Sequence, residues 1–519
     1  MSTAESREEL PHVPGAAGDG LALVPEPGGW PAADRPLLWA GGRAMSTWEF
    51  LAGVRRVAAA LPGDGPVTNL CEDRGRFLIG YCAALARGRT TLLPPSRAPL
   101  AVAEVTAAHA GSHRCDDDWV ARALARGLPS GPGGQEERDA RQTPGAPHPR
   151  EAHEPDGFGD AAAILHVPRE RVAEIAFTSG TTGTPRAHVK RWGTLLGSTE
   201  FNSGRIRESL APRYGGARPW IVATVPPQHM YGTETSVLLP LAADMAVHAG
   251  RPLYPADVAA ALAEVPEPRV LVTTPVHLQV LVASGERFAR VGVIVSATAP
   301  LDRRLAAEAE RAFGAVLLEM FGSTETCVIA TRRTAHEDAW HLYPGVALEP
   351  GCDGTRVSAP WFDAPAELQD VVELVEPARF VVRGRNADMV EVAGKRASLA
   401  DLTRRLLAIE GVRDGVVFQP DTGVAPARGA LVEAGLAPPA GGVRRVAALV
   451  VAPHLTAEAI LAELGRGIDP AFLPRPLVLV PALPRNELGK LSRGALLELA
   501  ARHLPRPGEL DRCDTMPRS

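Results

Sequence analysis

Hydrophobic residues after position 160 form short runs that alternate with longer Ala- and Leu-rich stretches. Short apolar runs between turn residues are typical of buried strands, whereas the longer stretches have helical composition. Alternation of strand and helix indicates parallel sheets covered by helices, so we predict a large layered α/β domain. The predicted strands are residues 174–177, 220–225, 269–273, 291–295 and 315–320, and the predicted helices are residues 255–264, 276–283 and 301–313.

The pattern changes beyond Arg385, where fewer elements follow one another in a mixed order. We therefore expect a large N-terminal domain at residues 1–384 and a small C-terminal α+β domain at residues 385–519. In the small domain the expected strands are residues 415–418, 446–451 and 477–480, and the expected helices are residues 400–409, 457–464 and 492–503.

Residues 128–160 are rich in Gly, Pro and charged residues and poor in apolar ones. Such a segment cannot bury enough apolar surface to offset the entropy of ordering, so we interpret it as a surface linker or long loop within the large domain.

Composition supports a globular protein, because 45% of the 519 residues are hydrophobic and 22% are charged. A net charge of -5 provides no basic field for nucleic acid. The six cysteines include no Cys-x-x-Cys pair, which argues against a zinc knuckle or disulfide framework. The polar N-terminus and the lack of an 18-residue apolar run indicate a cytoplasmic protein without a membrane span.

The densest chemical signal is residues 175–186, IAFTSGTTGTPR, where an apolar strand runs into a Thr/Ser/Gly loop. Closely spaced backbone N–H groups and hydroxyls, with glycines that permit close approach, suit the oxyanions of a polyphosphate. Arg186 adds a cation able to bind phosphate through two hydrogen bonds. The P-loop pattern G-x-x-x-x-G-K-[ST] does not match, and in isolation the loop could be an ordinary turn. The loop candidates are Thr178, Ser179, Gly180, Thr181, Thr182 and Gly183.

This segment resembles the phosphate-loop signature of the adenylate-forming superfamily, which includes acyl- and aryl-CoA synthetases, peptide-synthetase adenylation domains and luciferases. Residues 225–232, VPPQHMYG, resemble the next signature of the family, whose histidine, here His229, lies beside the acyl pocket. Residues 296–301, SATAPL, resemble the small-residue loop that lines the adenine and acyl sites, and Ala297 is the matching residue.

Residues 319–326, EMFGSTET, resemble the family's aromatic-Gly-x-Thr-Glu signature. The resemblance implies that Phe321 and Gly322 lie near adenine, that Thr324 meets the α-phosphate and that Glu325 holds magnesium. A carboxylate suits Mg²⁺, a hard cation that bridges phosphate oxygens.

Three later segments continue the resemblance in the same order. Asp370 matches the carboxylate that accepts hydrogen bonds from the ribose, and it lies 14 residues before Gly384, the common family spacing. Residues 384–399 resemble the hinge of the family's mobile C-terminal domain, in which Arg385 and Arg396 match arginines near ribose and phosphate. Residues 483–493, LPRNELGKLSR, resemble the signature that contains the catalytic lysine, here Lys490.

The resemblance implies an enzyme that uses ATP and Mg²⁺ to convert a small carboxylic acid into an acyl-adenylate. A thiol then attacks the adenylate to give a thioester and AMP. CoA is the expected acceptor, and the phosphopantetheine of an acyl carrier protein is the alternative. The segment AGKRASLADLTRRLLAIEGV also resembles synthetases of bacterial aryl-polyene pathways, which favours a hydroxybenzoate-like or other aryl acid.

Three departures from the family pattern leave a catalytically silent nucleotide-binding homologue as a further hypothesis. Arg186-Ala187 stands where the family usually has Lys-Gly, Leu368-Gln369 replaces Thr-Gly, and Ala387 occupies the hinge position. The presence of Thr324, Glu325 and Lys490 favours the enzyme, because a silent protein has no physical need for a lysine at that end of the chain.

Overall fold

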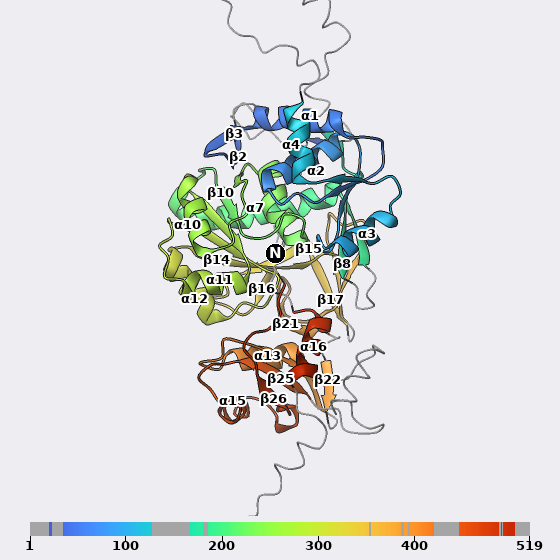
Figure 1. The fold of residues 1–519 in the computed structure, drawn as a ribbon. Helices are drawn as coiled ribbons and strands as arrows, with labels where there is room; N and C mark the ends of the chain where they lie inside the picture. The colour runs from blue at the N-terminus through green and yellow to red at the C-terminus, as the bar shows by residue number, and fades with distance from the viewer. Residues whose placement is uncertain are drawn as a thin grey trace, which may run out of the picture. The chain divides into compact units, whose positions relative to one another are not determined.

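The computed structural model describes residues 20–22, 35–126, 166–179, 185–351, 354–385, 389–392, 395–419, 446–486, 489 and 491–503 (Figure 1). The chain forms two compact units. The first comprises residues 1–272 and 286–293, and the second comprises residues 273–285 and 294–519. The linker predicted at residues 128–160 lies outside the described residues, and the domain boundary expected at 384/385 stays a prediction.

In the first unit, the strands of one sheet follow the order β12–β10–β11–β2–β3. Strand β10 runs parallel to both β11 and β12, whereas β3 pairs with β2 in the antiparallel direction. The strands are β2 (Pro36–Ala40), β3 (Arg43–Ser46), β10 (Trp220–Ala223), β11 (Ala246–His248) and β12 (Arg269–Thr273).

A second sheet of the first unit has the order β6–β4–β5–β8–β9, in which only β9 is antiparallel to its neighbour. Its strands are β4 (Val67–Asn69), β5 (Thr91–Leu93), β6 (His113–Cys115), β8 (Val172–Ser179) and β9 (Pro185–Arg191). A two-stranded sheet pairs β1 (Gly20–Ala22) with β7 (His166–Pro168).

Helices of the first unit begin at recognisable sequence signals. Ser46 caps α1 through a capping box, since the Glu49 N–H donates to Ser46 Oγ and the Ser46 N–H donates to Glu49 Oε2. Pro255 opens α10, where its missing N–H costs nothing. The helices are α1 (Thr47–Ala60), α2 (Arg74–Ala86), α3 (Pro99–Ala107), α4 (Asp117–Ala125), α7 (Trp192–Tyr214), α8 (Met230–Thr233), the π-helical η2 (Glu234–Leu238), α9 (Leu239–Ala242) and α10 (Pro255–Glu264).

In the second unit, the order β20–β21–β16–β15–β14–β13 brings strands from distant parts of the sequence side by side. The strands are β13 (Val293–Ser296), β14 (Val316–Ser323), β15 (Cys327–Arg332), β16 (Trp340–Leu342), β20 (Asp370–Glu376) and β21 (Arg379–Arg385). Helices α11 (Pro275–Ala283) and α12 (Arg303–Phe313) belong to the same unit, as does a small sheet of β17 (Ala347–Gly351), β18 (Gly354–Ser358) and β19 (Ala366–Leu368).

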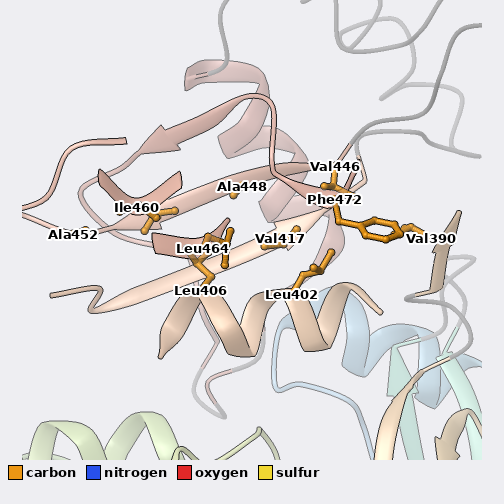
Figure 2. Close-up of a cluster of buried hydrophobic side chains, with 11 residues drawn as sticks. Val390, Leu402, Leu406, Val417, Val446, Ala448, Ala452, Ile460, Leu464 and Phe472 are labelled. Atoms are coloured by element: carbon orange, nitrogen blue, oxygen red, sulfur yellow. The ribbon is translucent and has the colours of Figure 1, made fainter. Parts of the chain in front are cut away.

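The C-terminal part of the second unit has its own apolar core. Leu402 and Leu406 of α13 are buried and point toward the sheet that carries Val417, as Figure 2 shows. Ile460 and Leu464, both on helix α15, complete this core. The elements are β22 (Met389–Val392), β23 (Lys395–Ser398), α13 (Leu399–Leu407), β24 (Asp414–Phe418), β25 (Ala447–Val451), α15 (Ala457–Leu464), η4 (Pro470–Phe472), β26 (Leu477–Leu479) and α16 (Arg493–His503).

The predicted fold class, a large layered α/β part with parallel sheets and a small C-terminal α+β part, is confirmed. The expected boundaries agree with the structure to within a few residues. Strand β14 continues to Ser323, three residues beyond its predicted end, because the Phe321–Ser323 backbone still pairs with β15. No helix in the described part of the chain combines the length and apolarity needed to cross a bilayer.

Candidate functional site

The β8–β9 hairpin in the first unit places Thr178 opposite Arg186. Ser179 pairs with Pro185 at the end of the ladder, so both strands lead directly into the Thr/Ser/Gly loop. Arg186 is exposed, which leaves its guanidinium accessible to an anion. The other loop candidates, Gly180, Thr181, Thr182 and Gly183, lie outside the described residues.

A histidine that sequence reasoning missed contacts Thr178. His188 lies two residues after Arg186 on β9, and its Nε2 is 2.9 Å from the hydroxyl oxygen of Thr178. His188 is only 8% exposed. The period-2 pattern of a strand, which places residues 186, 188 and 190 on one face, was the signal that could have found it.

His229 lies at the N-cap position of α8, in the connection that follows β10. Its carbonyl accepts the Thr233 N–H at 2.7 Å, and the Thr233 hydroxyl donates to the Pro227 carbonyl at 2.7 Å. Any side chain at Gly232 would collide with the Pro226 carbonyl oxygen, so this turn requires glycine. The motif thus forms a tight, buried turn that holds His229 at a helix N-terminus.

In the second unit, residues 323–326 form a turn between β14 and β15. The Ser323 hydroxyl accepts the backbone N–H groups of Glu325 and Thr326 at 3.1 and 3.2 Å. In return, the Thr326 hydroxyl accepts the Ser323 N–H at 3.1 Å. These reciprocal bonds fix the backbone on which Thr324 and Glu325 are carried.

Phe321 precedes this turn and packs against two other aromatic rings. Its ring centroid lies 5.2 Å from that of Trp340 on β16 and 5.2 Å from that of Phe380 on β21. The Arg332 guanidinium lies over the Trp340 ring, 4.3 Å from its centre, and makes a cation–π contact with it. This packing fixes the orientation of the aromatic ring that the motif predicted.

A buried carboxylate, that of Glu319, links strands β14 and β15. Glu319 accepts hydrogen bonds from the Arg332 guanidinium at 2.8 Å and from the Thr334 hydroxyl at 2.6 Å. Burial raises the pKa of Glu319, although the Arg332 charge and the Thr334 hydrogen bond oppose this shift. Glu319 therefore stabilises the β14–β15 pair through Arg332, the residue that also contacts Trp340.

Asp370 begins β20 and is paired with Arg385 at the end of β21. Its own carbonyl accepts the Thr355 hydroxyl at 2.7 Å. The spacing of 14 residues between Asp370 and Gly384 thus corresponds to one antiparallel hairpin, whose β21 strand is joined through β16 and β15 to β14. Ala297 directly follows β13 and is 8% exposed. The second unit therefore carries Phe321 and Asp370 on strands of one sheet, and Ala297, Thr324 and Glu325 directly after strands of the same sheet.

Comparison with protein families identifies the family to which a chain with these motifs belongs. The model of the AMP-binding enzyme family matches residues 30–354, well over half of the chain. The chain belongs to the AMP-binding enzyme family.

Curated relatives are similar over part of this AMP-binding enzyme. A 4-coumarate–CoA ligase from Rhodobacter capsulatus is 32% identical over 245 residues, which is 47% of this chain and 60% of the relative. A mitochondrial malonate–CoA ligase from Mus musculus is 24% identical over 407 residues, 64% of this chain and 65% of the relative. The chain thus spans about 60% of the length of the first of these relatives.

Solved structures share the fold at low sequence identity. ATP-bound MatB from Rhodopseudomonas palustris has a TM-score of 0.67 at 18% identity, covering 90% of this chain and 96% of that chain. The O-succinylbenzoate CoA synthetase MenE from Bacillus subtilis, in complex with ATP and a magnesium ion, has a TM-score of 0.66 at 16% identity over 89% of this chain and 96% of its own. These likenesses establish the fold of the AMP-binding enzyme.

The donors that the structure describes fit a nucleotide and Mg²⁺. In the second unit, an aromatic ring, hydroxyls and a carboxylate suit a base and a ribose; in the first unit, taken by itself, a hydroxyl and an exposed arginine suit phosphates. The described part of the chain holds no cluster of three His, Cys, Asp or Glu side chains suited to a metal. Mg²⁺ does not need one, because it commonly takes one or two carboxylates together with substrate phosphates. Glu325 can supply that single carboxylate.

The remaining site candidates belong to the C-terminal part of the enzyme. Arg385 ends β21, and Arg396 of β23 pairs with Glu391 of β22, but the side chains of both arginines lie outside the described residues. Lys490 also lies outside them, directly after Gly489. A bridge between Arg485 and Leu491 closes the segment that contains this lysine.

Proposed function

We propose that this AMP-binding enzyme activates a carboxylic acid as its acyl-adenylate and transfers the acyl group to the thiol of CoA. The family supports the first half of this proposal, and the curated relatives, among them ligases named for coumarate, 2-succinylbenzoate and indoleacetate, support CoA as the acceptor. The observation that carries the proposal is the fixed turn after Phe321, which presents Thr324 and Glu325 in the order expected of an ATP site.

The chemistry begins with a poor electrophile, because a carboxylate is anionic and its oxygen leaves badly. In the first half-reaction the carboxylate oxygen attacks the α-phosphorus of ATP, and pyrophosphate leaves with the electron pair of the broken P–O bond. Arg186 and the Thr178 hydroxyl hold the departing β- and γ-phosphates. Mg²⁺, when bound, neutralises charge on the phosphate oxygens. In the second half-reaction the thiol sulfur attacks the acyl carbon, and AMP leaves.

Lys490 supplies a positive charge to the carboxylate and the α-phosphate in this proposal. The composition of the chain supports a specific role, because its 55 basic residues include only three lysines, Lys190, Lys395 and Lys490. An ammonium is a compact point charge, whereas a guanidinium is planar and larger, so the two are not interchangeable at a reacting centre.

The aryl class of acid, hydroxybenzoate-like, is the substrate class that we propose. Its support is the resemblance to aryl-polyene synthetases, together with the aryl and arylacetic acids in the names of several relatives. Loading of a carrier protein's phosphopantetheine is the alternative for the second half-reaction, since it presents the same thiol arm as CoA.

The test is acid-dependent release of pyrophosphate with ATP and Mg²⁺ across benzoates, cinnamates and fatty acids. Release with one acid class, lowered about 10²–10³-fold by Lys490→Ala, is the expected result. Arg466→Ala, which removes an exposed cation paired with Glu463, is the matched control and should leave the rate unchanged. Nucleotide binding without release for any acid would instead support a catalytically silent homologue.

The acceptor is identified in a second assay with the acid found in the first. Formation of acyl-CoA, detected by mass spectrometry, is expected. Acylation of a phosphopantetheinylated carrier protein without acyl-CoA formation would identify the carrier protein, and not CoA, as the acceptor.

A further inference from the structure

One face of the β8–β9 hairpin is polar and buried, although such a face usually points to solvent. Cross-strand pairing places Glu174 opposite Lys190 and Ala176 opposite His188. Glu174 is fully buried, Lys190 is 4% exposed and His188 is 8% exposed, whereas Val189 on the other face is 57% exposed. A hairpin that served only for packing would turn its valine inward, because buried polar groups cost free energy unless they are paired.

The end of this polar face that adjoins the phosphate loop is the Thr178–His188 pair. The 2.9 Å separation between Thr178 Oγ1 and His188 Nε2 is that of a hydrogen bond. A threonine hydroxyl has one proton to donate and two lone pairs that accept. The tautomer of His188 therefore determines whether the Thr178 hydroxyl proton is available to a ligand.

If His188 Nε2 accepts, the Thr178 proton is used inside the hairpin, and only the lone pairs of the hydroxyl remain for a ligand. If Nε2 carries the proton, it donates to Thr178, and the Thr178 O–H is released to donate elsewhere. A phosphate beside the hydroxyl selects the second arrangement, since it repels the lone pairs and attracts the proton.

We propose that His188 is a positioning residue that donates from Nε2–H to Thr178 and thereby directs the Thr178 hydroxyl proton toward a phosphate oxygen of ATP. This inference rests on the proposed function, because it requires ATP to be the ligand of the loop. His188 itself contacts no substrate and acts only through the hydroxyl.

The opposite end of the polar face anchors the hairpin. Glu174 accepts a hydrogen bond from the Tyr81 hydroxyl of α2 at 2.9 Å and lies across the ladder from Lys190. A one-residue slip of β9 would move His188 and Lys190 to the exposed face and leave Glu174 buried without its cationic neighbour. The Tyr81–Glu174 hydrogen bond and the cross-strand pairing of Glu174 with Lys190 therefore favour the register that keeps His188 beside Thr178.

The test measures binding of ATP with Mg²⁺ by isothermal titration calorimetry. Thr178→Val and His188→Leu should each weaken binding about ten-fold, the size expected for one hydrogen bond to a charged group. The double variant should bind about as weakly as either single variant, because His188 acts on the ligand only through the Thr178 hydroxyl.

Two polar replacements separate positioning from packing. The side-chain amide of Gln reaches about as far as histidine Nε2, whereas that of Asn is one methylene shorter. We expect His188→Gln to retain most of the affinity and His188→Asn to lose it. His109→Leu is the control, because His109 packs against the Phe177 ring on the other face of β8, and it should leave the dissociation constant unchanged.

The outcomes distinguish this inference from the proposed function. Additive losses in the double variant, or equal affinities for the Gln and Asn variants, would overturn the positioning role while leaving ATP as the ligand. Absence of ATP binding by the unaltered protein would overturn the proposed function and the inference together. Thermal unfolding of each variant identifies any that fail to fold, and the comparison of Gln with Asn then decides.

Discussion

Arg485 and Asp414 form a bidentate ion pair, with Nε donating to Oδ2 at 2.8 Å and Nη2 donating to Oδ1 at 2.7 Å. The remaining Nη1 donates to the Gly489 carbonyl at 2.9 Å. Asp414 begins β24, so one guanidinium ties the backbone directly before Lys490 to the C-terminal sheet. The planar fork of arginine is suited to this contact, because two of its parallel N–H groups match the two carboxylate oxygens, a geometry that a lysine ammonium lacks.

Replacing Arg485 by Ala should therefore reduce catalysis more than stability. We expect the rate of pyrophosphate release to fall about ten-fold, because the backbone directly before Lys490 loses its hydrogen bond to Arg485 and no longer positions the lysine charge. Both partners are about one-quarter exposed, at 22% and 28%, so the loss of unfolding free energy should be only about 1 kcal/mol. Steady-state kinetics and thermal unfolding check the two effects. Equal rates for Arg485→Ala and the unaltered enzyme would contradict this support.

Gly322 is a site where an added methyl group should be poorly tolerated. A Cβ atom there would collide with the Cys327 carbonyl oxygen, since β14 and β15 approach each other closely at a bulge. Gly322→Ala should cost about 1–3 kcal/mol of stability and lower activity, because the turn with Thr324 and Glu325 must shift.

The matched control is Gly204→Ala in α7, where the added methyl group has no neighbour within 4 Å. It should raise stability by about 0.5–1 kcal/mol, since alanine is the better helix former. Chemical denaturation of both variants tests the pair. Similar effects of the two changes would show that the close approach at Gly322 carries no penalty.

Phe321→Leu should weaken nucleotide binding selectively. The ring is fixed by Trp340 and Phe380, and a flat surface held in place favours stacking of an adenine. We expect the KM for ATP to rise about ten-fold while the KM for the acid changes little. Phe362→Leu, which alters a ring that contacts Trp361, is the comparison and should leave both constants unchanged. A rise in the KM for the acid alone would assign Phe321 to the acyl site.

Glu174 should make stability depend on pH. Burial raises the pKa of its carboxyl from 4.5 to about 7, against the opposing effects of the Tyr81 hydrogen bond and the Lys190 charge. The folded state thus binds the proton more tightly than the unfolded chain. The stabilisation from this group is complete below about pH 4.5 and is lost as the pH rises to about 7.

Glu174→Gln keeps the shape of the side chain and removes this titration. The stability that the variant gains relative to the unaltered protein should grow as the pH rises from 5 to 7, from less than about 1 kcal/mol to on the order of 3 kcal/mol. Thermal unfolding at several pH values measures the difference. A difference that stays constant with pH would place the titrating group elsewhere.

The sequence by itself determined the fold class, the boundaries of the elements that it predicted to within a few residues, and the order of the motifs. Helices α10 and α15 begin and end at the predicted residues, since Pro255 opens the first and the Thr456 hydroxyl caps the second. Such signals are local, because a helix or strand reveals its period and its ends within a few residues. The motif that contains Phe321 was likewise readable, because all of its residues are contiguous.

Only the tertiary structure decided which polar side chains face inward and what they contact. Tyr81 and Glu174 are 93 residues apart in sequence, and Arg485 and Asp414 are 71 apart, so nothing local links either pair. The alternation of a strand gives two faces without saying which is buried, and in β9 the polar face turned inward while Val189 remained exposed. The bond between Thr178 and His188 follows from that choice, because which face is covered depends on what packs against the strand and not on the strand's own residues.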